Sequence, residues 1–267
     1  MTADVRKITS HANPEIKKIK SLAMRKYREE EGVFLTEGLR HALEAAEAGW
    51  DFQTLVIEES VREKDLVKKL LSLIAKQDCL LLEVNQDIME GITKRDNAQN
   101  VVAVLKQRWG SLADIKDGLW IALEEIRDPG NLGTIIRTAD AVGANGIILI
   151  ENTCDPYSLE AIRASMGSFP HVRLIRAKRE EFTTWGQKSG FQIVGTHLRT
   201  DHDYRGIEYK KSVVLLMGNE QAGLTDDLSK LCTHLVKIPM QGKADSLNVS
   251  VATAIMLYEI NRASLKI

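Results

Sequence analysis

An alternation of short apolar runs with amphipathic segments begins at Leu119 and continues to the last residues, and this alternation restricts the possible folds most strongly. The apolar runs have the length of strands, and the segments between them have helical spacing. This order of strands and helices forms a mostly parallel sheet with helices on both faces. We predict strands at 119–125, 146–150, 171–176, 191–196, 212–217 and 234–239, and helices at 132–142, 158–167, 178–188, 224–231 and 248–262. The sequence therefore predicts an α/β domain over residues 119–267.

The first part of the chain predicts a second, smaller α/β domain over residues 31–106. Its segments predict strands at 53–58, 80–84 and 100–105, and helices at 37–48 and 61–76. Lysines and arginines crowd a basic, helical arm at residues 1–30, and a polar linker is expected at residues 107–118. Basic clusters can contact phosphates, but a solvated helix face is an equally good interpretation of this one.

The composition and the cysteines indicate a folded protein of the cytoplasm. Hydrophobic residues make up 44% and charged residues 27% of the 267 residues, which is typical of globular domains. No segment approaches the roughly 20 apolar residues of a membrane span, and the first residues lack the apolar core of a signal peptide. Cys79, Cys154 and Cys232 are widely spaced and form no CxxC pair, so we expect reduced thiols rather than disulfides or metal ligands.

Three apolar runs end in loops that are rich in glycine, asparagine and aspartate and that lead into a helical segment. These junctions span residues 121–144, 213–224 and 236–260. Parallel sheets bind ligands beyond the carboxyl ends of their strands, so the three loops predict one composite site. The chain lacks the GxGxxG and P-loop patterns of nucleotide binders and the HExxH pattern of zinc enzymes. The sequence therefore disfavours a nicotinamide-dependent enzyme and a catalytic metal.

Five polar side chains in these loops are candidates for chemistry: Asn131, Arg137, Glu220, Ser246 and Asn248. Taken alone, Asn131, Ser246 or Asn248 could simply cap a helix. Arg137 could be exposed, or paired with Asp140 or Glu124. Capping, however, requires neither an arginine nor a carboxylate at a strand end. The combination therefore favours a functional site over three separate helix caps.

The three loops resemble the three signature motifs of the SpoU/TrmH-type RNA ribose 2′-O-methyltransferases, which belong to the knotted SPOUT superfamily. Motif one corresponds to residues 125–139, motif two to 216–224 and motif three to 238–252, in the order of the family. The first domain resembles the family's L30e-like substrate-binding domain, notably at residues 34–38. The resemblance is weakest at residues 91–99, where many relatives have a Pro-Gln-Gly-like turn.

This resemblance implies a fold, a reaction and partners. It implies a trefoil-knotted domain that transfers a methyl group from S-adenosylmethionine to a ribose 2′-hydroxyl, usually of guanosine. The separate first domain favours ribosomal RNA over transfer RNA as the partner, and relatives commonly form homodimers. The residues implied in catalysis are Arg137, Asn131, Glu220, Ser246 and Asn248. The residues implied in cofactor binding are Thr196, Met217, Gly218, Ile238, Met240 and Leu247.

Two alternatives concern the role of the arginine and the function itself. The family's arginine is often described as a general base, yet a guanidinium is almost always protonated. Arg137 could instead stay charged, stabilise the developing alkoxide and hold an RNA phosphate. The alternative function is a catalytically silent RNA-binding or ribosome-assembly factor on the same scaffold, which would bind RNA but not the cofactor.

Overall fold

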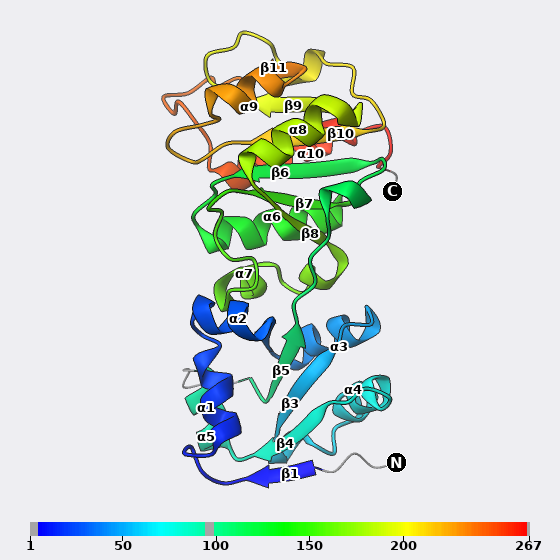
Figure 1. The fold of residues 1–267 in the computed structure, drawn as a ribbon, viewed down its shortest axis with the longest axis vertical. Coiled ribbons are helices and arrows are strands. Elements are labelled where there is room, and N and C mark those ends of the chain that lie inside the picture. The colour runs from blue at the N-terminus through cyan, green and yellow to red at the C-terminus, as the bar shows by residue number, and fades with distance from the viewer. Residues whose placement is uncertain (1–4, 94–98, 266–267) are drawn as a thin grey trace. The chain divides into compact units, whose positions relative to one another are not determined.

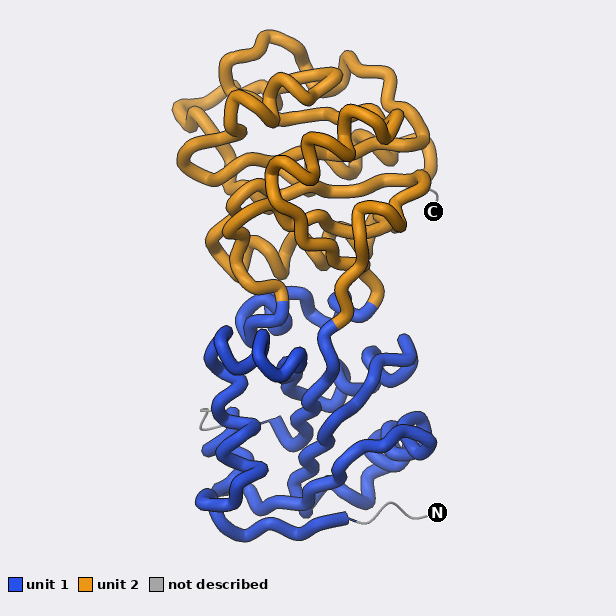
Figure 2. Tube along the Cα trace, in the orientation of Figure 1, with its two compact units in different colours: residues 1–107, 157–170 blue, residues 108–156, 171–267 orange. Residues whose placement is uncertain are grey.

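The computed structural model describes residues 5–93 and 99–265, and the chain forms two compact units (Figure 2). Unit 1 consists of residues 1–107 and 157–170, and unit 2 of residues 108–156 and 171–267. The chain therefore enters unit 2 after Gln107, returns to unit 1 for a short segment, and leaves it again after Pro170. The comparison with a Pro-Gln-Gly-like turn falls largely on residues 94–98, which lie outside the described residues.

Unit 2 is built on a six-stranded sheet in the order β11-β9-β10-β6-β7-β8, and every pairing in it is parallel (Figure 1). The strands are β6 (Leu119–Glu124), β7 (Gly146–Ile150), β8 (Arg173–Ala177), β9 (Gln192–Thr196), β10 (Val213–Met217) and β11 (His234–Val236). This confirms the predicted parallel α/β fold. The last strand is shorter than predicted, and Pro239, which has no backbone donor for a ladder, lies within its predicted range.

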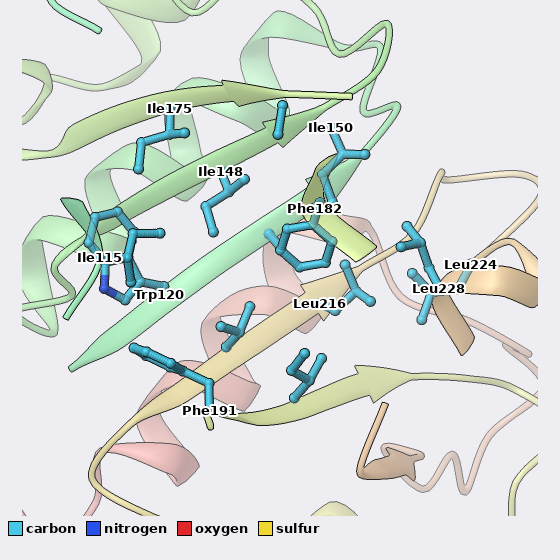
Figure 3. Close-up of a cluster of buried hydrophobic side chains, with 14 residues drawn as sticks. Ile115, Trp120, Ile148, Ile150, Ile175, Phe182, Phe191, Leu216, Leu224 and Leu228 are labelled. Carbon is cyan, nitrogen blue, oxygen red and sulfur yellow. The ribbon is translucent and has the colours of Figure 1, made fainter. Parts of the chain in front are cut away.

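Helices cover both faces of the unit 2 sheet. On one face lie α6 (Pro129–Ala141) and α10 (Val249–Ile260), and on the other lie α8 (Arg179–Ser189) and α9 (Asp226–Leu231) (Figure 1). Under α8 and α9, alternate residues of the strands form a core with Phe182 and Leu228, centred on Trp120, Ile148 and Leu216 (Figure 3). Because both faces are buried, the strands are almost continuously apolar, as parallel strands usually are.

The segment predicted as a polar linker is part of unit 2. Gly110 N donates to the carbonyl oxygen of Leu174 (2.8 Å), so the segment lies along the outer edge of β8. Ser111 and Asp114 form a capping box around a short 3-10 turn, and Ile115 is buried in the core. The polar residues that predicted a linker therefore satisfy a turn that closes the edge of the sheet.

Unit 1 has a five-stranded mixed sheet in the order β1-β4-β3-β5-β2. Its strands are β1 (Val5–Ile8), β2 (Val33–Glu37), β3 (Phe52–Glu58), β4 (Leu80–Val84) and β5 (Val101–Lys106). Strands β1 and β2 were not predicted. From Val5 onward, the predicted basic arm is therefore built into unit 1, because β1 pairs in parallel with β4.

Helices also cover the unit 1 sheet. Apolar residues of α1 (Pro14–Ser21) and α5 (Gln86–Thr93) share one core with β2, β3, β4 and β5. Helix α3 (Leu39–Glu47) packs against α4 (Asp65–Ile74), β5 and β2. Helix α2 (Arg25–Glu31) follows α1 after a break at residues 22–24, so the helical arm is two helices rather than one. The strongly amphipathic pattern of these helices is explained by burial of a single face.

The basic residues of α1 and α2 are largely paired within the chain. Lys18 pairs with Glu31, Arg25 with Glu29 and Lys26 with Glu30. Arg28 is buried, and its Nη1 donates to the carbonyl oxygens of Leu22 (2.7 Å) and Ala23 (2.9 Å) at the end of α1. Of the two interpretations of this cluster, the structure favours the helix face over a phosphate-binding arm.

The segment 157–170, which contains α7 (Leu159–Ala164), belongs to unit 1 rather than to the domain in which its helix was predicted. Tyr157 and Phe169 pack on Phe34, with ring centroids 4.5 and 5.6 Å away. Trp50 completes this aromatic cluster and donates from its ring nitrogen to the carbonyl oxygen of Pro170 (3.2 Å). The two rings of the segment are therefore buried in unit 1, where aromatic pairs are most favourable.

A buried ion pair also holds this segment. Nη2 and Nε of Arg163 donate to the same carboxylate oxygen of Glu37, at 2.6 and 3.1 Å. The Glu37 side chain is only 3% exposed. Glu37 lies in the stretch 34–38 that resembles the family's first domain, and it contacts protein here.

The three cysteines are free thiols, and burial raises the pKa of Cys79, Cys154 and Cys232 to about 12. An unfolded thiol ionises near pH 8.5. The folded state therefore retains protons that the unfolded state releases, and stability is expected to fall as the pH rises from about 8.5 toward 12. Thermal unfolding at pH 7.5 and pH 10 should show this loss, and a Cys→Ala triple variant should show less of it. If the triple variant lost as much stability as the wild type, the loss would not arise from the buried thiols.

Candidate active site

The loops after β6 and β10 meet because these two strands are neighbours in the sheet, with Met217 opposite Leu123. From β6 the chain moves outward to β7 and β8, and it then returns to β9 and β10 on the other side of β6. At such a reversal of strand order the loops on the two sides diverge and leave a crevice at the carboxyl edge. Three of the polar side chains predicted from the sequence, those of Asn131, Glu220 and Asn248, meet at this edge.

The first loop starts α6 through Asp128, whose carboxylate accepts a hydrogen bond from Asn131 N (2.6 Å). Pro129 occupies the first helical position, where its missing N–H costs nothing. Helix α6 thus begins three residues earlier than predicted, and Asp128 rather than Asn131 is its cap. The side chain of Asn131 is therefore available for other contacts.

The second loop is a tight hairpin between Asn219 and Gly223, which exchange backbone hydrogen bonds. The side-chain oxygen of Asn219 accepts from the backbone N–H groups of Gln221 (3.0 Å) and Ala222 (3.1 Å). Its amide nitrogen donates to the carbonyl oxygen of Glu125 (2.9 Å) in the first loop. The hairpin that carries Glu220 is therefore attached to the end of β6.

The third loop joins the other two through Asn248, the cap of α10. Asn248 Nδ2 donates to Asn131 Oδ1 (2.9 Å), and Asn131 Nδ2 donates to a carboxylate oxygen of Glu220 (3.4 Å). Three residues that are far apart in sequence thus form one hydrogen-bonded chain. The cap prediction for Asn248 holds as well, since its Oδ1 accepts from Ser250 N (2.9 Å).

Two predicted catalytic residues stand apart from this chain. Ser246 is exposed in the segment that precedes α10. Arg137 is exposed on α6, and it makes no hydrogen bond or ion pair within the part of the chain that the structure describes. Its suggested partner Glu124 is bound instead by Arg179 and Thr225. The guanidinium of Arg137 is therefore not neutralised by a carboxylate of the described residues.

The residues expected to bind the cofactor lie on segments at the same edge of the sheet. Thr196 ends β9 and its hydroxyl donates to Sδ of Met217 at the end of β10 (3.6 Å). Ile238 and Met240 are half-buried after β11, and Leu247 is 37% exposed before α10. Ile238, Met240 and Leu247 leave apolar surface uncovered, and the loop after β10 carries an exposed carboxylate, Glu220. Such a surface fits a ligand that combines an aromatic base with a positive charge.

Gly218 occupies a position that no larger residue can fill without a shift of the backbone. A Cβ atom there would lie 2.3 Å from the carbonyl carbon of Gly223 and 2.4 Å from Leu224 N. We expect Gly218→Ala to lower the free energy of unfolding by about 1–3 kcal/mol, as overpacking does, and to weaken cofactor binding. Urea unfolding and calorimetry would measure the two effects. Gly206→Ala is the matched control, because Gly206 lies outside the three motif loops and nothing lies within 4 Å of a Cβ there; equal behaviour of the two variants would contradict the prediction.

Sequence reasoning missed three residues at this edge. Glu124 is buried and binds both Arg179 and Thr225, and Asn219 organises the hairpin. The pKa of Cys154 is raised first by burial and then by Asp128 and Glu220, which places its thiol beside the first two loops. Of these three residues, only Glu124 could have been found from the sequence, because it is a charged residue at the end of an apolar strand. No group of three or more His, Cys, Asp or Glu side chains suited to a metal occurs in the described ranges.

A parallel sheet whose carboxyl edge gathers an asparagine, a second asparagine and a carboxylate from three loops defines an α/β domain with a composite ligand site. A substrate-binding unit accompanies this domain: residues 13–103 match the model of the MRM3-like substrate binding domain. The chain belongs to the SpoU rRNA Methylase family, whose model matches residues 118–258. The resemblance inferred from the three motifs is thereby confirmed.

Two curated relatives span nearly the whole chain. The 23S rRNA (guanosine(2553)-2′-O)-methyltransferase RlmP of Bacillus subtilis is 30% identical and covers 96% of this chain and 99% of its own. The 23S rRNA (uridine(2479)-2′-O)-methyltransferase of Streptomyces viridochromogenes is 32% identical over 90% of this chain and 86% of its own.

Solved structures agree with the fold. The AdoMet-bound rRNA methyltransferase from Sinorhizobium meliloti is 45% identical, with a TM-score of 0.93 over 98% of this chain and 99% of that one. The SpoU methyltransferase AviRb from Streptomyces viridochromogenes, in complex with AdoMet, is 30% identical, with a TM-score of 0.84 over 94% and 98% of the two chains. This protein is thus an S-adenosylmethionine-dependent RNA 2′-O-methyltransferase, as predicted. No helix within the described residues is long and apolar enough to cross a membrane.

Proposed function

We propose that this protein methylates a ribose 2′-hydroxyl of ribosomal RNA, with guanosine as the modified nucleotide, in the cytoplasm. The observation that carries the proposal is the hydrogen-bonded chain from Asn248 through Asn131 to Glu220, which joins all three motif loops. The names of the two curated relatives support ribosomal RNA over transfer RNA. One of these names specifies guanosine and the other uridine, so the nucleotide rests on the longer match and on the family resemblance.

S-adenosylmethionine, when bound, supplies a methyl group that is activated by its sulfonium charge. We assign its binding to the apolar edge formed by Met217, Ile238, Met240 and Leu247, together with Gly218 and Thr196. Gly218 lets the hairpin lie close to the end of β10. Glu220 offers a negative charge at this edge, and Asn131 and Asn248 hold the carboxylate in place. Holding the two reactants in attack geometry is the main contribution that such a site makes.

We assign binding of the reacting ribose and its phosphate to Arg137. Ser246, two residues before Asn248, is assigned to the same part of the site. An exposed guanidinium that no carboxylate of the described residues neutralises can donate two parallel hydrogen bonds to a phosphate. The same positive charge stabilises the oxyanion that develops on the 2′-hydroxyl. This arrangement favours charge stabilisation over a general-base role, since a base would have to release its proton first.

We further propose that unit 1 selects the RNA, that unit 2 carries the family's trefoil knot, and that the protein forms a homodimer. The match of residues 13–103 to a substrate-binding domain supports the first assignment. An apolar stripe on α10 supports the homodimer: Val251 and Tyr258 are 47% and 51% exposed and lie two turns apart on one side of the helix. Covering this stripe would remove exposed apolar surface from water.

The proposal is tested by mapping ribose methylation across all stable RNAs of a strain that lacks the gene. One guanosine of ribosomal RNA should lose its 2′-O-methyl group, and the intact gene, but not an Arg137→Ala form, should restore it. Loss of methylation in a transfer RNA would overturn the proposal of ribosomal RNA, and loss at a uridine would overturn the proposal of guanosine. Calorimetry with S-adenosylmethionine addresses the silent-factor alternative, since a silent factor would bind RNA without binding the cofactor.

A further inference from the structure

Two consecutive glutamates, the last residue of β6 and the residue that follows it, hold the hairpin of the second loop. The first, Glu124, is 1% exposed. One of its carboxylate oxygens accepts from the Thr225 hydroxyl (2.9 Å) and the other from Thr225 N (2.9 Å). Thr225 lies two residues after the hairpin, at the N-cap position of α9, and its hydroxyl makes no capping bond to that helix. The exit of the hairpin is therefore tied to a buried carboxylate.

The second glutamate holds the entrance of the same hairpin. The carbonyl oxygen of Glu125 accepts from the side chain of Asn219 (2.9 Å). Glu125 adopts a left-handed conformation, with φ of 51°, which is rare for a residue other than glycine. This strained conformation is maintained only if its surroundings determine it. The exit of the hairpin is thus attached to Glu124, the last residue of β6, and the entrance to Glu125, the residue after it.

One arginine connects the two glutamates. Arg179, the first residue of α8, donates from Nε to Glu124 (3.0 Å) and from Nη2 to the Glu125 carboxylate (3.3 Å). Its backbone N–H donates to the side chain of Glu151 at the end of β7 (2.6 Å). Glu151 is also left-handed, with φ of 55°. Arg179 therefore holds both glutamates with its planar guanidinium fork, which a lysine cannot reproduce, and it reaches the end of β7 through its backbone N–H.

A buried ion pair is a weak source of stability, because removing two charges from water costs about as much as their attraction returns. A better-supported effect of a buried ion pair is that it holds the surrounding chain in one conformation rather than several. The geometry defined here is that of the hairpin that carries Gly218 and Glu220. We propose that Arg179 and Glu124 are positioning residues, which fix this hairpin through Thr225 and thereby set the affinity for S-adenosylmethionine. The inference rests on the proposed cofactor site.

Calorimetric titration with S-adenosylmethionine tests the proposal on the full chain. The variants are Arg179→Ala, Arg179→Lys, Glu124→Gln and Thr225→Val, and Thr225→Val is the mildest because it removes one hydroxyl and keeps the backbone donor. Glu181→Gln is the matched control, since Glu181 accepts from Lys178 N at the start of the same helix and touches neither Glu124 nor Glu125. Thermal unfolding of each variant shows which ones are folded.

We expect the Kd to rise about tenfold in Thr225→Val, the effect of losing one charge-assisted hydrogen bond, and to rise further in Glu124→Gln and Arg179→Ala, which also lose the ion pair. Arg179→Lys should recover part of the affinity, because an ammonium can reach one carboxylate but not both. Glu181→Gln should bind like the wild type. A folded Thr225→Val with wild-type affinity would overturn the proposal, as would an equal loss in the control. Failure of the wild type to bind the cofactor would instead overturn the proposed cofactor site.

Discussion

Replacing Arg137 with alanine is expected to lower the rate of methyl transfer by about 100- to 1,000-fold, the range found when one oxyanion-stabilising group is removed. Folding and cofactor affinity should remain those of the wild type, because Arg137 is exposed and contacts no polar partner among the described residues. The rate is measured with labelled S-adenosylmethionine and the RNA identified by mapping. Calorimetry and thermal unfolding measure the two quantities that should not change.

Arg137→Lys separates the two roles of this arginine. A lysine keeps the positive charge, so charge stabilisation predicts partial recovery of the rate. It offers no bidentate fork, so RNA binding should stay weaker than in the wild type. Lys188→Ala removes another exposed cation of unit 2, from the helix on the other face of the sheet, and should leave the rate unchanged. Wild-type activity in Arg137→Ala would exclude the arginine from catalysis.

Replacing Arg163 with alanine is expected to lower the free energy of unfolding of unit 1 by about 3–5 kcal/mol. The reason is that the Glu37 carboxylate, which is 3% exposed, would remain buried without its cation. The segment 157–170 would also lose its ion pair with β2, while the aromatic contacts of Tyr157 and Phe169 and the hydrogen bond from Trp50 to Pro170 would remain. Urea unfolding gives the free energy, and hydrogen exchange in β2 and β5 identifies the unit that loses stability.

A double variant tests this explanation. Glu37→Met combined with Arg163→Met removes both charges and leaves no buried polar group at either position, so most of the lost stability should return. Lys69→Ala breaks the exposed pair with Glu47 in the same unit and should cost less than about 1 kcal/mol. If the double variant is as unstable as Arg163→Ala, the loss does not arise from an unpaired buried charge.

Most elements of the unit 2 sheet could be predicted because burial on both faces leaves a local mark. A strand such as β7 is apolar throughout, and it was predicted with the bounds that the structure shows. Strand β1 of unit 1 was missed because it carries no such mark, whereas β2 was missed although all five of its residues are buried. The residues of β1 are half-buried at the two ends of the strand and exposed between them, in a short basic stretch, and their partner β4 lies more than seventy residues later in the chain. Only pairing with that partner makes them a strand.

In the candidate site, too, one part could be predicted from the sequence and another could not. The types of its residues were evident, since a carboxylate in a glycine-rich loop and an arginine on a helix satisfy no local packing need. The hydrogen-bond and ion-pair partners of these residues could not be predicted. Asp128 caps α6 and so frees Asn131, and Arg179 rather than Arg137 binds Glu124. Capping preferences rank aspartate and asparagine alike, and no local pattern distinguishes which arginine a distant glutamate will meet.

The sequence by itself determined the parallel α/β domain, its three loops and the residues that these loops present, because periodicity and loop composition are properties of short segments. The tertiary structure decided that residues 157–170 join unit 1, that Arg28 is a buried capping residue, and that Asn131, Glu220 and Asn248 form one hydrogen-bonded chain. Each of these depends on which distant residue supplies the partner for a buried ring, charge or amide. That choice depends on how the whole chain packs, so no short segment can reveal it.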